Sequence, residues 1–287
     1  MYTPLQAPTT TSSTSPLTIR HQSQTSPQRA FWASDARFRL FVGGRGSGKT
    51  RAGAIEALRQ PEGSTGLIIA PSYPMLRLGA METILNLVAQ AGIAEAWNKS
   101  EMELRLLGGR RIIFRSADNP DRHRGANVGW LWLDEAALMD ADIWPTAIAT
   151  LRHAPGKAWA TTTPRGKNWL YDLWVSGGDD YADTESSTTE NTYLPAHFIT
   201  TLKQSMTSEM YAQEVDGRFI DPIGQMFQRH WFSVVPRAPE GLKWARYWDF
   251  AASTKTSADY SASIKAALSP DGTLFLDGGI KMKAEWP

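Results

Sequence analysis

Eight residues near the start of the chain constrain its fold and chemistry more than any others. In order they are Gly-Gly-Arg-Gly-Ser-Gly-Lys-Thr, which fits G-x-x-x-x-G-K-[ST] between an expected strand at 37–42 and an expected helix at 50–59. The glycines let successive backbone amides curl around phosphate oxygens, and the positive end of the helix dipole faces the same anion. The predicted nucleotide-binding residues of this phosphate-binding loop (P-loop) are Gly43, Gly44, Arg45, Gly46, Ser47, Gly48, Lys49 and Thr50.

Three side chains of the loop have specific predicted roles. We expect Lys49 to reach the β- and γ-phosphates of ATP, and the hydroxyl of Thr50 to ligate Mg²⁺. Phosphoryl transfer also needs a cation near the charge that develops on the γ-phosphoryl group, and Arg45 lies within the loop itself. The alternative is a glycine-rich turn that contains Lys-Thr without binding phosphate.

An acid pair follows the apolar run Trp130–Leu133. At the end of a sheet strand beside a P-loop, Asp134 is predicted to fix Mg²⁺, and Glu135 to orient or deprotonate the attacking water. That second acid separates a hydrolase from a protein that only binds nucleotide. Alternatively, the two acids cap a helix at 136–139, where they favour its dipole.

The order of expected elements predicts an α/β fold. Apolar strands at 37–42, 66–70, 130–133 and 157–162 alternate with amphipathic helices at 50–59 and 81–91, which is typical of a parallel sheet flanked by helices. With the acid pair, this is a P-loop nucleotide-hydrolase fold of the catalytic-glutamate (ASCE) type. A hairpin is expected at 103–115, an exposed polar loop at 176–192, and helices over 195–214.

Composition bounds the remaining possibilities. The 287 residues carry a net charge of +1 and no Cys, so disulfide scaffolds and Cys-ligated metal sites are excluded, and no global charge attracts nucleic acid. No apolar run reaches the roughly 18–20 residues that cross a bilayer, so we expect no membrane partner. We predict a disordered Ser/Thr/Pro-rich tail at 1–30, one α/β domain at 31–220, a Pro/Gly-rich linker at 221–243 and a second domain from 244 to 287.

One segment concentrates basic side chains. Five Arg residues lie between Arg110 and Arg124 against only two acids. Arg122 and Arg124 in particular are candidates for an arginine finger toward a neighbouring subunit or for contacts with DNA phosphates, and a solvated basic surface is the third possibility.

Taken in order, these segments resemble the large terminase subunits of tailed bacteriophages, the motors that package and cut DNA. The similarity rests on Arg45 within the P-loop, on Asp121–Ala126 ahead of the acid pair, and on Thr161–Gly166. The last stretch resembles the family's coupling motif, which implies that Thr161, Thr162 and Thr163 link hydrolysis to movement. Asn191–Pro195 and Tyr211–Phe219 are similar to later stretches of the family's ATPase region, and Gln28 matches a residue that reads adenine.

The resemblance also gives the second domain a meaning. In this family an RNase H-like nuclease follows the ATPase, and Tyr247–Ala251 matches its first strand. This implies that Asp249, with Asp259 as a second candidate, binds Mg²⁺ or Mn²⁺ in a two-metal phosphodiesterase site. The 47 residues from Gly241 to Pro287 are far fewer than such a nuclease needs, so we expect an incomplete domain from a shortened gene product or prophage remnant.

The implied function is an ATP-driven motor that moves double-stranded DNA into a phage prohead. The implied partners are DNA, the portal protein, a small terminase subunit and further copies of this chain in a ring. The motor would act in the host bacterial cytoplasm, transiently at the prohead portal, without remaining in the mature virion. Two alternatives stay open: another P-loop ATPase or helicase-like protein with no packaging role, and a non-catalytic prophage remnant.

Overall fold

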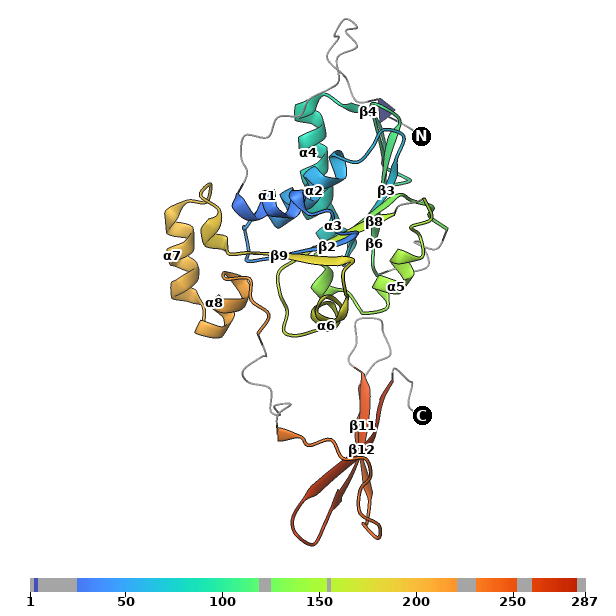
Figure 1. Ribbon diagram of the computed structural model, residues 1–287, viewed down its shortest axis with the longest axis vertical. Coiled ribbons are helices and arrows are strands. Elements are labelled where there is room, and N and C mark those ends of the chain that lie inside the picture. The colour runs from blue at the N-terminus through green and yellow to red at the C-terminus, as the bar shows by residue number, and fades with distance from the viewer. Residues whose placement is uncertain are drawn as a thin grey trace, which may run out of the picture. The chain divides into compact units, whose positions relative to one another are not determined.

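The computed structural model describes residues 3–4, 25–118, 125–153, 156–220, 231–251 and 260–282. The chain divides into two compact units, Met1–Ile223 and Gly224–Pro287. Within its described residues, the first unit contains one nine-stranded sheet in the order β1-β4-β5-β6-β3-β7-β8-β2-β9 (Figure 1). The parallel strands are not in chain order within the sheet, so the connections between them cross over its faces.

Six neighbouring strands of this sheet are parallel. They are β6 (Arg110–Ser116), β3 (Thr65–Ala70), β7 (Trp130–Asp134), β8 (Lys157–Thr162), β2 (Phe38–Gly43) and β9 (Tyr181–Ser186). The inner strands β2, β3, β7 and β8 are buried along almost their whole length. Continuous apolar runs are expected where helices cover both faces of a parallel sheet, and this accounts for the sequence pattern.

The other edge of the sheet is antiparallel. There β1 (Thr3–Pro4), β4 (Ala94–Asn98) and β5 (Glu103–Leu106) extend the sheet beyond β6. The β5–β6 hairpin turns at Gly108 and Gly109, whose φ angles of +77° and +69° lie in the left-handed region that glycine adopts without strain. This hairpin confirms the one predicted at 103–115.

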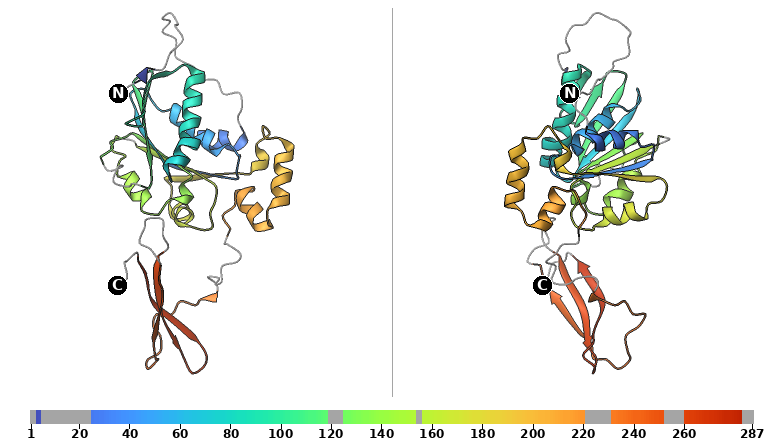
Figure 2. Two further views of the ribbon diagram at one scale, coloured as in Figure 1. Left: turned by 180° about the vertical axis from the view of Figure 1, so that it is seen from behind. Right: turned by 60° about the vertical axis from the view of Figure 1, so that its left-hand side comes forward.

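Helices cover the two faces of the sheet. One face packs against α1 (Ser26–Ala33), α2 (Lys49–Leu58) and α4 (Glu82–Ala91), and the other against α5 (Ile143–Ile148) and α6 (Trp169–Ser176) (Figures 1 and 2). Alternate residues of one strand supply the two cores: Phe41 points to the first cluster, and Leu40 and Val42 to the second. The predicted parallel sheet flanked by helices is confirmed.

Shorter elements connect these layers. Before α4 the chain forms α3 (Tyr73–Leu76) and a π-helical turn at Arg77–Met81. A 3₁₀ turn at Ala136–Leu138 follows β7, and another at Thr188–Glu190 follows β9. The last two helices of the unit are α7 (Ala196–Ser205) and α8 (Ser208–Glu214), in the segment where helices were predicted.

Two predictions differ from the structure, one in a boundary and one in the type of element. The disordered tail was expected to extend to residue 30, but α1 begins at Ser26 because Thr25 and Gln28 form a capping box at its N-terminus. The exposed loop expected at 176–192 contains β9, which pairs in parallel with β2 at the edge of the sheet. Its polar sequence, Tyr-Ala-Asp-Thr-Glu-Ser, is what an edge strand tolerates, since only one side is paired and charge discourages further pairing.

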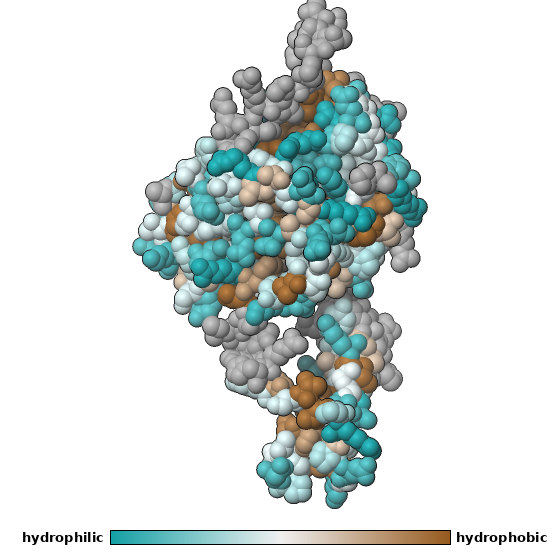
Figure 3. Space-filling view, viewed as in Figure 1, coloured by the Kyte–Doolittle hydropathy of each residue, from teal (hydrophilic) through white to brown (hydrophobic). Residues whose placement is uncertain are grey.

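The second unit contains a three-stranded antiparallel sheet in its described residues. Its order is β10 (Ala245–Asp249), β11 (Ser261–Leu268) and β12 (Leu274–Met282). Hydrophobic residues gather on the visible face of this unit (Figure 3). Leu268 and Leu274 are among its exposed side chains. No helix or strand occurs at 232–244, while 221–230 of the predicted linker lie outside the described residues. Among the described residues of the whole chain, no helix has the length and apolar character to cross a membrane.

Candidate functional site

The loop between β2 and α2 has glycine where the packing demands it. Gly48 is the N-cap of α2 with φ of +92°, in the left-handed region. At Gly44, a Cβ atom would lie 2.1 Å from the carbonyl oxygen of Val215, so the loop backbone packs directly against the segment that follows α8. The loop opens at the N-terminus of a ten-residue helix, where backbone amides and the helix dipole favour an anion.

Gln28 contacts this loop from α1. Its Nε2 donates to the carbonyl oxygen of Gly48 at 2.9 Å, and its Oε1 accepts from the backbone N–H of Thr25 at 3.1 Å. The side chain is buried. Gln28 therefore ties the start of α1 to the P-loop, and its predicted role in reading adenine stays a prediction.

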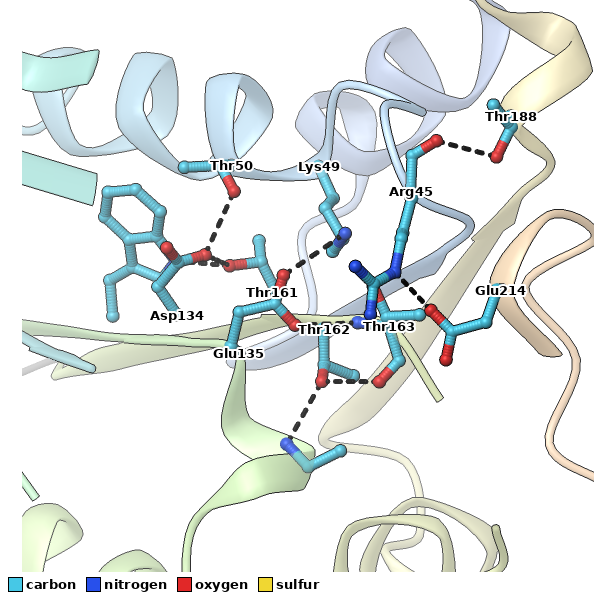
Figure 4. A network of polar contacts seen from close by, with 12 residues as sticks. Arg45, Lys49, Thr50, Asp134, Glu135, Thr161, Thr162, Thr163, Thr188 and Glu214 are labelled. Carbon is cyan, nitrogen blue, oxygen red and sulfur yellow. Dashed lines mark hydrogen bonds and ion pairs between the residues drawn. The ribbon is translucent and has the colours of Figure 1, made fainter. Parts of the chain in front are cut away.

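Asp134 and Thr161 lie side by side at the carboxyl ends of β7 and β8, where their Cα atoms are in register. The Thr161 hydroxyl donates to Asp134 Oδ1 at 2.6 Å, and the Thr50 hydroxyl donates to the same oxygen at 3.3 Å (Figure 4). Asp134 is buried. The structure thus brings together Asp134 and the Thr50 hydroxyl, which were predicted to share a metal ion.

The environment of Asp134 disfavours the ionised form of its carboxyl group. Burial raises the pKa of its carboxyl group to about 6, and the neighbouring charge of Glu135 acts in the same direction. The hydrogen bond from Thr161, the charge of Lys49 and the hydrogen bond from Thr50 oppose that rise in pKa. A bound cation would shift the same balance toward the ionised carboxylate.

Glu135 has an unusual backbone and two fixed carboxylate oxygens. Its φ of +54° lies in the left-handed region, which is uncommon for a residue with a Cβ atom. Lys49 Nζ lies 3.2 Å from Oε1, and the backbone N–H of Thr163 donates to Oε2 at 3.1 Å. Glu135 stands at the N-cap of the following 3₁₀ turn without a side-chain capping bond. The carboxylate of Glu135 therefore contacts Lys49 and Thr163, and it does not cap the turn through a side-chain hydrogen bond.

All three threonines of the predicted coupling stretch contact the acid pair or the turn after it. Thr161 donates to Asp134, and the backbone N–H of Thr163 donates to Glu135. The Thr162 hydroxyl accepts from the backbone N–H of Ala137 at 3.1 Å and donates to the Thr163 carbonyl oxygen at 3.0 Å. A displacement of the acid pair would therefore displace the end of β8 and the backbone that follows it.

Arg45 projects from the loop toward α8 and pairs with Glu214, its Nε donating to Oε2 (Figure 4). The backbone N–H of Arg45 also donates to the carbonyl oxygen of Glu214 at 2.7 Å. The ion pair with Glu214 raises the pKa of Arg45. Gln213, next to Glu214, accepts from the backbone N–H of Gly166 at 3.0 Å, so α8 contacts both the P-loop and the coupling stretch.

Two further side chains hold the loop, and sequence reasoning assigned them no role. Thr188 Oγ1 donates to the carbonyl oxygen of Arg45 at 2.8 Å, and Asn191 Nδ2 donates to that of Gly46 at 2.6 Å. Both follow β9, the strand that the sequence did not reveal. The sequence did contain a signal for the 3₁₀ turn after β9, because Ser187 and Glu190 have the spacing of a capping box.

Four further predicted site residues are Arg122, Arg124, Asp249 and Asp259. Arg122, Arg124 and Asp259 lie outside the described residues. Asp249 is exposed at the end of β10, which is an edge strand of the described sheet. No three His, Cys, Asp or Glu side chains of the described residues converge as a metal-binding group. The predicted metal site at Asp249 and Asp259 therefore stays a prediction.

The donors at the P-loop do fit Mg²⁺. The Thr50 hydroxyl and the Asp134 carboxylate are hard oxygen ligands that already contact one another. Mg²⁺ in nucleotide sites is usually bound by one or two protein oxygens together with substrate phosphates and water, so a larger cluster of acids is not required.

A family model described as terminase large subunit, T4likevirus-type, N-terminal, matches residues 40–234, which include the P-loop, the acid pair and the coupling stretch. The chain belongs to this family. The terminase large subunit of Thermus virus P23-45 is 34% identical over 172 residues, covering 52% of this chain and 36% of that protein. The chain thus matches little more than a third of the length of this terminase, and the resemblance to large terminase subunits is confirmed.

Solved terminase structures share the fold. The large terminase ATPase domain of Thermus phage P74-26 superposes with a TM-score of 0.57 and 24% identity, covering 69% of this chain and 94% of that one. The large terminase of a thermophilic bacteriophage superposes with a TM-score of 0.63 and 15% identity, covering 91% of this chain and 69% of that one. Other crystals of this thermophilic phage terminase contain ADP or ATP-γ-S.

Proposed function

We propose that this chain hydrolyses ATP with Mg²⁺ and uses the energy to move double-stranded DNA into a phage prohead. The observation that carries the proposal is the convergence of Lys49, Thr50, Asp134 and Glu135 at one edge of the parallel sheet. Membership of the terminase family and the nucleotide complexes of the thermophilic phage terminase support it.

The residues divide the work of phosphoryl transfer. The loop amides and Lys49 bind the triphosphate. Thr50 and Asp134 would hold Mg²⁺, which would supply positive charge to the phosphate oxygens. Glu135 orients the attacking water and accepts its proton as the bond between the γ-phosphorus and the ADP oxygen breaks. The hydrogen bond that the Thr163 backbone N–H donates to Glu135 Oε2 fixes the direction of this carboxylate.

The proposed coupling to movement runs through contacts on both sides of the loop. Thr161, Thr162 and Thr163 connect the acid pair to the strand β8, and Glu214 connects Arg45 to α8. Because packed elements shift as units, a change at the phosphate would move these segments together.

The proposed partners follow from family membership. They are double-stranded DNA, a portal protein, a small terminase subunit and further copies of this chain in a ring, in the host bacterial cytoplasm and transiently at the prohead. Arg122 and Arg124 are proposed as the arginine finger or as DNA contacts. The nuclease metal site at Asp249 stays a prediction, and no DNA-cleavage step is derived from it.

The test compares the whole chain with Lys49→Ala and with Lys99→Ala, which removes an exposed lysine of the β4–β5 turn. We expect Lys49→Ala to weaken MgATP binding roughly ten- to hundredfold, because it removes a charge-assisted contact to phosphate. Lys99→Ala should match the wild type in calorimetric titrations and steady-state hydrolysis.

Two outcomes separate the parts of the proposal. A wild-type chain that neither binds nor hydrolyses MgATP would refute the ATPase. A chain that hydrolyses ATP at a rate unaffected by double-stranded DNA and portal-bearing proheads, and that fails to package DNA with them, would refute the packaging role alone.

A further inference from the structure

Trp132 is part of a buried hydrogen-bond chain that ends at the acid pair. It occupies the middle of β7, and its indole Nε1 donates to Thr161 Oγ1 at 2.7 Å. The Thr161 hydroxyl in turn donates to Asp134 Oδ1 at 2.6 Å. All three side chains are buried, so water does not compete for these bonds.

The chemistry of the donor groups fixes the direction of these two hydrogen bonds. An indole N–H only donates, whereas a hydroxyl has one proton to donate and lone pairs that accept. Because Thr161 Oγ1 must accept from Trp132, its single proton is directed to Asp134. The carboxylate oxygen Oδ1 therefore receives an oriented hydrogen bond from β8 as well as the one from Thr50.

Packing holds the indole in the position from which it can donate to Thr161. A Cβ atom at Gly53 of α2 would lie 2.5 Å from Cε2 of Trp132, so the ring packs directly against the helix that begins at the P-loop. This contact and the bond to Thr161 hold the buried ring from two sides.

We propose that Trp132 is a positioning residue that, through the Thr161 hydroxyl, orients Asp134 to hold the Mg²⁺ of the bound nucleotide. The inference rests on the proposed nucleotide site and adds a residue to it. It assigns to Thr161 a second role beside coupling, since the hydroxyl transmits the constraint from Trp132 to the carboxylate.

The chain offers a matched control at Trp159. This tryptophan is also buried, on the neighbouring strand β8, but its indole nitrogen has no hydrogen-bond partner within the described residues. Trp132→Phe and Trp159→Phe both replace a buried indole by a benzene ring. Only the first removes a hydrogen bond that leads to Asp134.

The experiment measures the Mg²⁺ concentration needed for half-maximal binding of fluorescent ADP to the whole chain. We expect Trp132→Phe to raise that concentration about three- to tenfold over Trp159→Phe, because one oriented buried hydrogen bond is lost. Affinity for ADP in EDTA should be equal in the two variants. In a Thr161→Val background, Trp132→Phe should cause no further rise, since the hydroxyl through which it acts is gone.

A measurement on the wild-type fold covers the case in which Trp132→Phe does not fold. With ¹⁵N-labelled tryptophan, the indole resonance that moves on Thr161→Val is that of Trp132, and we expect it to move on adding MgADP but not ADP with EDTA. If no indole resonance responds to both changes, the proposal is overturned.

The outcomes distinguish this inference from the proposed function. Wild-type protein that binds no nucleotide with Mg²⁺ overturns both. Wild-type protein that binds MgADP, with equal Mg²⁺ dependence in Trp132→Phe and Trp159→Phe, overturns the positioning role of Trp132 and leaves the nucleotide site intact.

Discussion

Lys49 Nζ and Glu135 Oε1 lie 3.2 Å apart, so the lysine of the P-loop pairs with the carboxylate proposed to activate water. Their side chains are only 7% and 24% exposed, which limits screening of the pair by solvent. A phosphate group is a second anion that competes with Glu135 for the same cation. Binding of the triphosphate and release of the carboxylate are therefore linked in the proposed mechanism.

The first prediction concerns Glu135→Gln, which keeps the side-chain shape and removes the negative charge. ATP hydrolysis should fall by about a hundredfold or more, because the base is lost. MgATP affinity should be unchanged or higher, because the anion that competes for Lys49 is lost. Calorimetry and steady-state rates check both parts, with Glu95→Gln, an exposed position on β4, as the control. Equal hydrolysis rates in the two variants would remove Glu135 from the mechanism.

The second prediction concerns the pH dependence of stability. The carboxyl group of Asp134 has an ordinary pKa of 3.8, and in the folded protein burial raises its pKa to about 6. Between these values the folded state keeps a proton that the unfolded chain has released, so the free energy of unfolding falls as pH rises from about 4 to 6. The pKa shift of about two units corresponds to a loss of at most about 3 kcal/mol.

Asp134→Asn should flatten that part of the profile. The measurement is urea unfolding without nucleotide or Mg²⁺ at several values between pH 4 and 7. Asp140→Asn, at an exposed position after β7, should retain the wild-type slope. Identical slopes for wild type and Asp134→Asn would contradict the raised pKa.

The third prediction concerns the contact between the P-loop and the segment after α8. In Gly44→Ala the new Cβ would lie 2.1 Å from the Val215 carbonyl oxygen and 2.3 Å from Thr188 Oγ1. Backbone must move to relieve this overlap, and we expect a loss of about 1–3 kcal/mol in the free energy of unfolding. Gly129→Ala meets no atom nearer than 3.8 Å and should be much milder. Equal denaturant midpoints would show that the loop is not packed as described.

The fourth prediction concerns the Arg45–Glu214 ion pair, whose side chains are 68% and 16% exposed. Since one partner is largely solvated, a double-mutant cycle of Arg45→Ala and Glu214→Gln should give a coupling energy for stability below about 1 kcal/mol. Raising the ionic strength should reduce the coupling further. A coupling energy of about 3 kcal/mol would instead indicate a pair isolated from solvent.

The sequence predicted the centre of the site because its signals are local. Gly43–Thr50 and the acid pair carry their chemistry in a few adjacent residues, and each follows a buried strand whose apolar run is evident. The carboxyl ends of parallel strands meet at one edge, so those motifs were expected to converge.

The parts that the sequence did not predict depend on contacts distant along the chain. The strand β9 is polar and pairs on one side only, so its composition resembles a loop, and Thr188 after it gained no role. Glu214 is one acid among many until α8 brings it to Arg45. The indole of Trp132 belongs to an apolar run that predicts only burial, and its bond to Thr161 depends on the register of β7 with β8.

At Glu135 the requirements of backbone stability and of the proposed chemistry differ, because the residue adopts a left-handed conformation. A residue with a Cβ atom at positive φ costs on the order of 1 kcal/mol, a strain that glycine would relieve and asparagine would lessen. Neither of those residues supplies a base. If Glu135 is the base, as proposed, replacing it by either residue would relax the backbone and abolish ATP hydrolysis, so the proposed catalytic role carries a cost in stability.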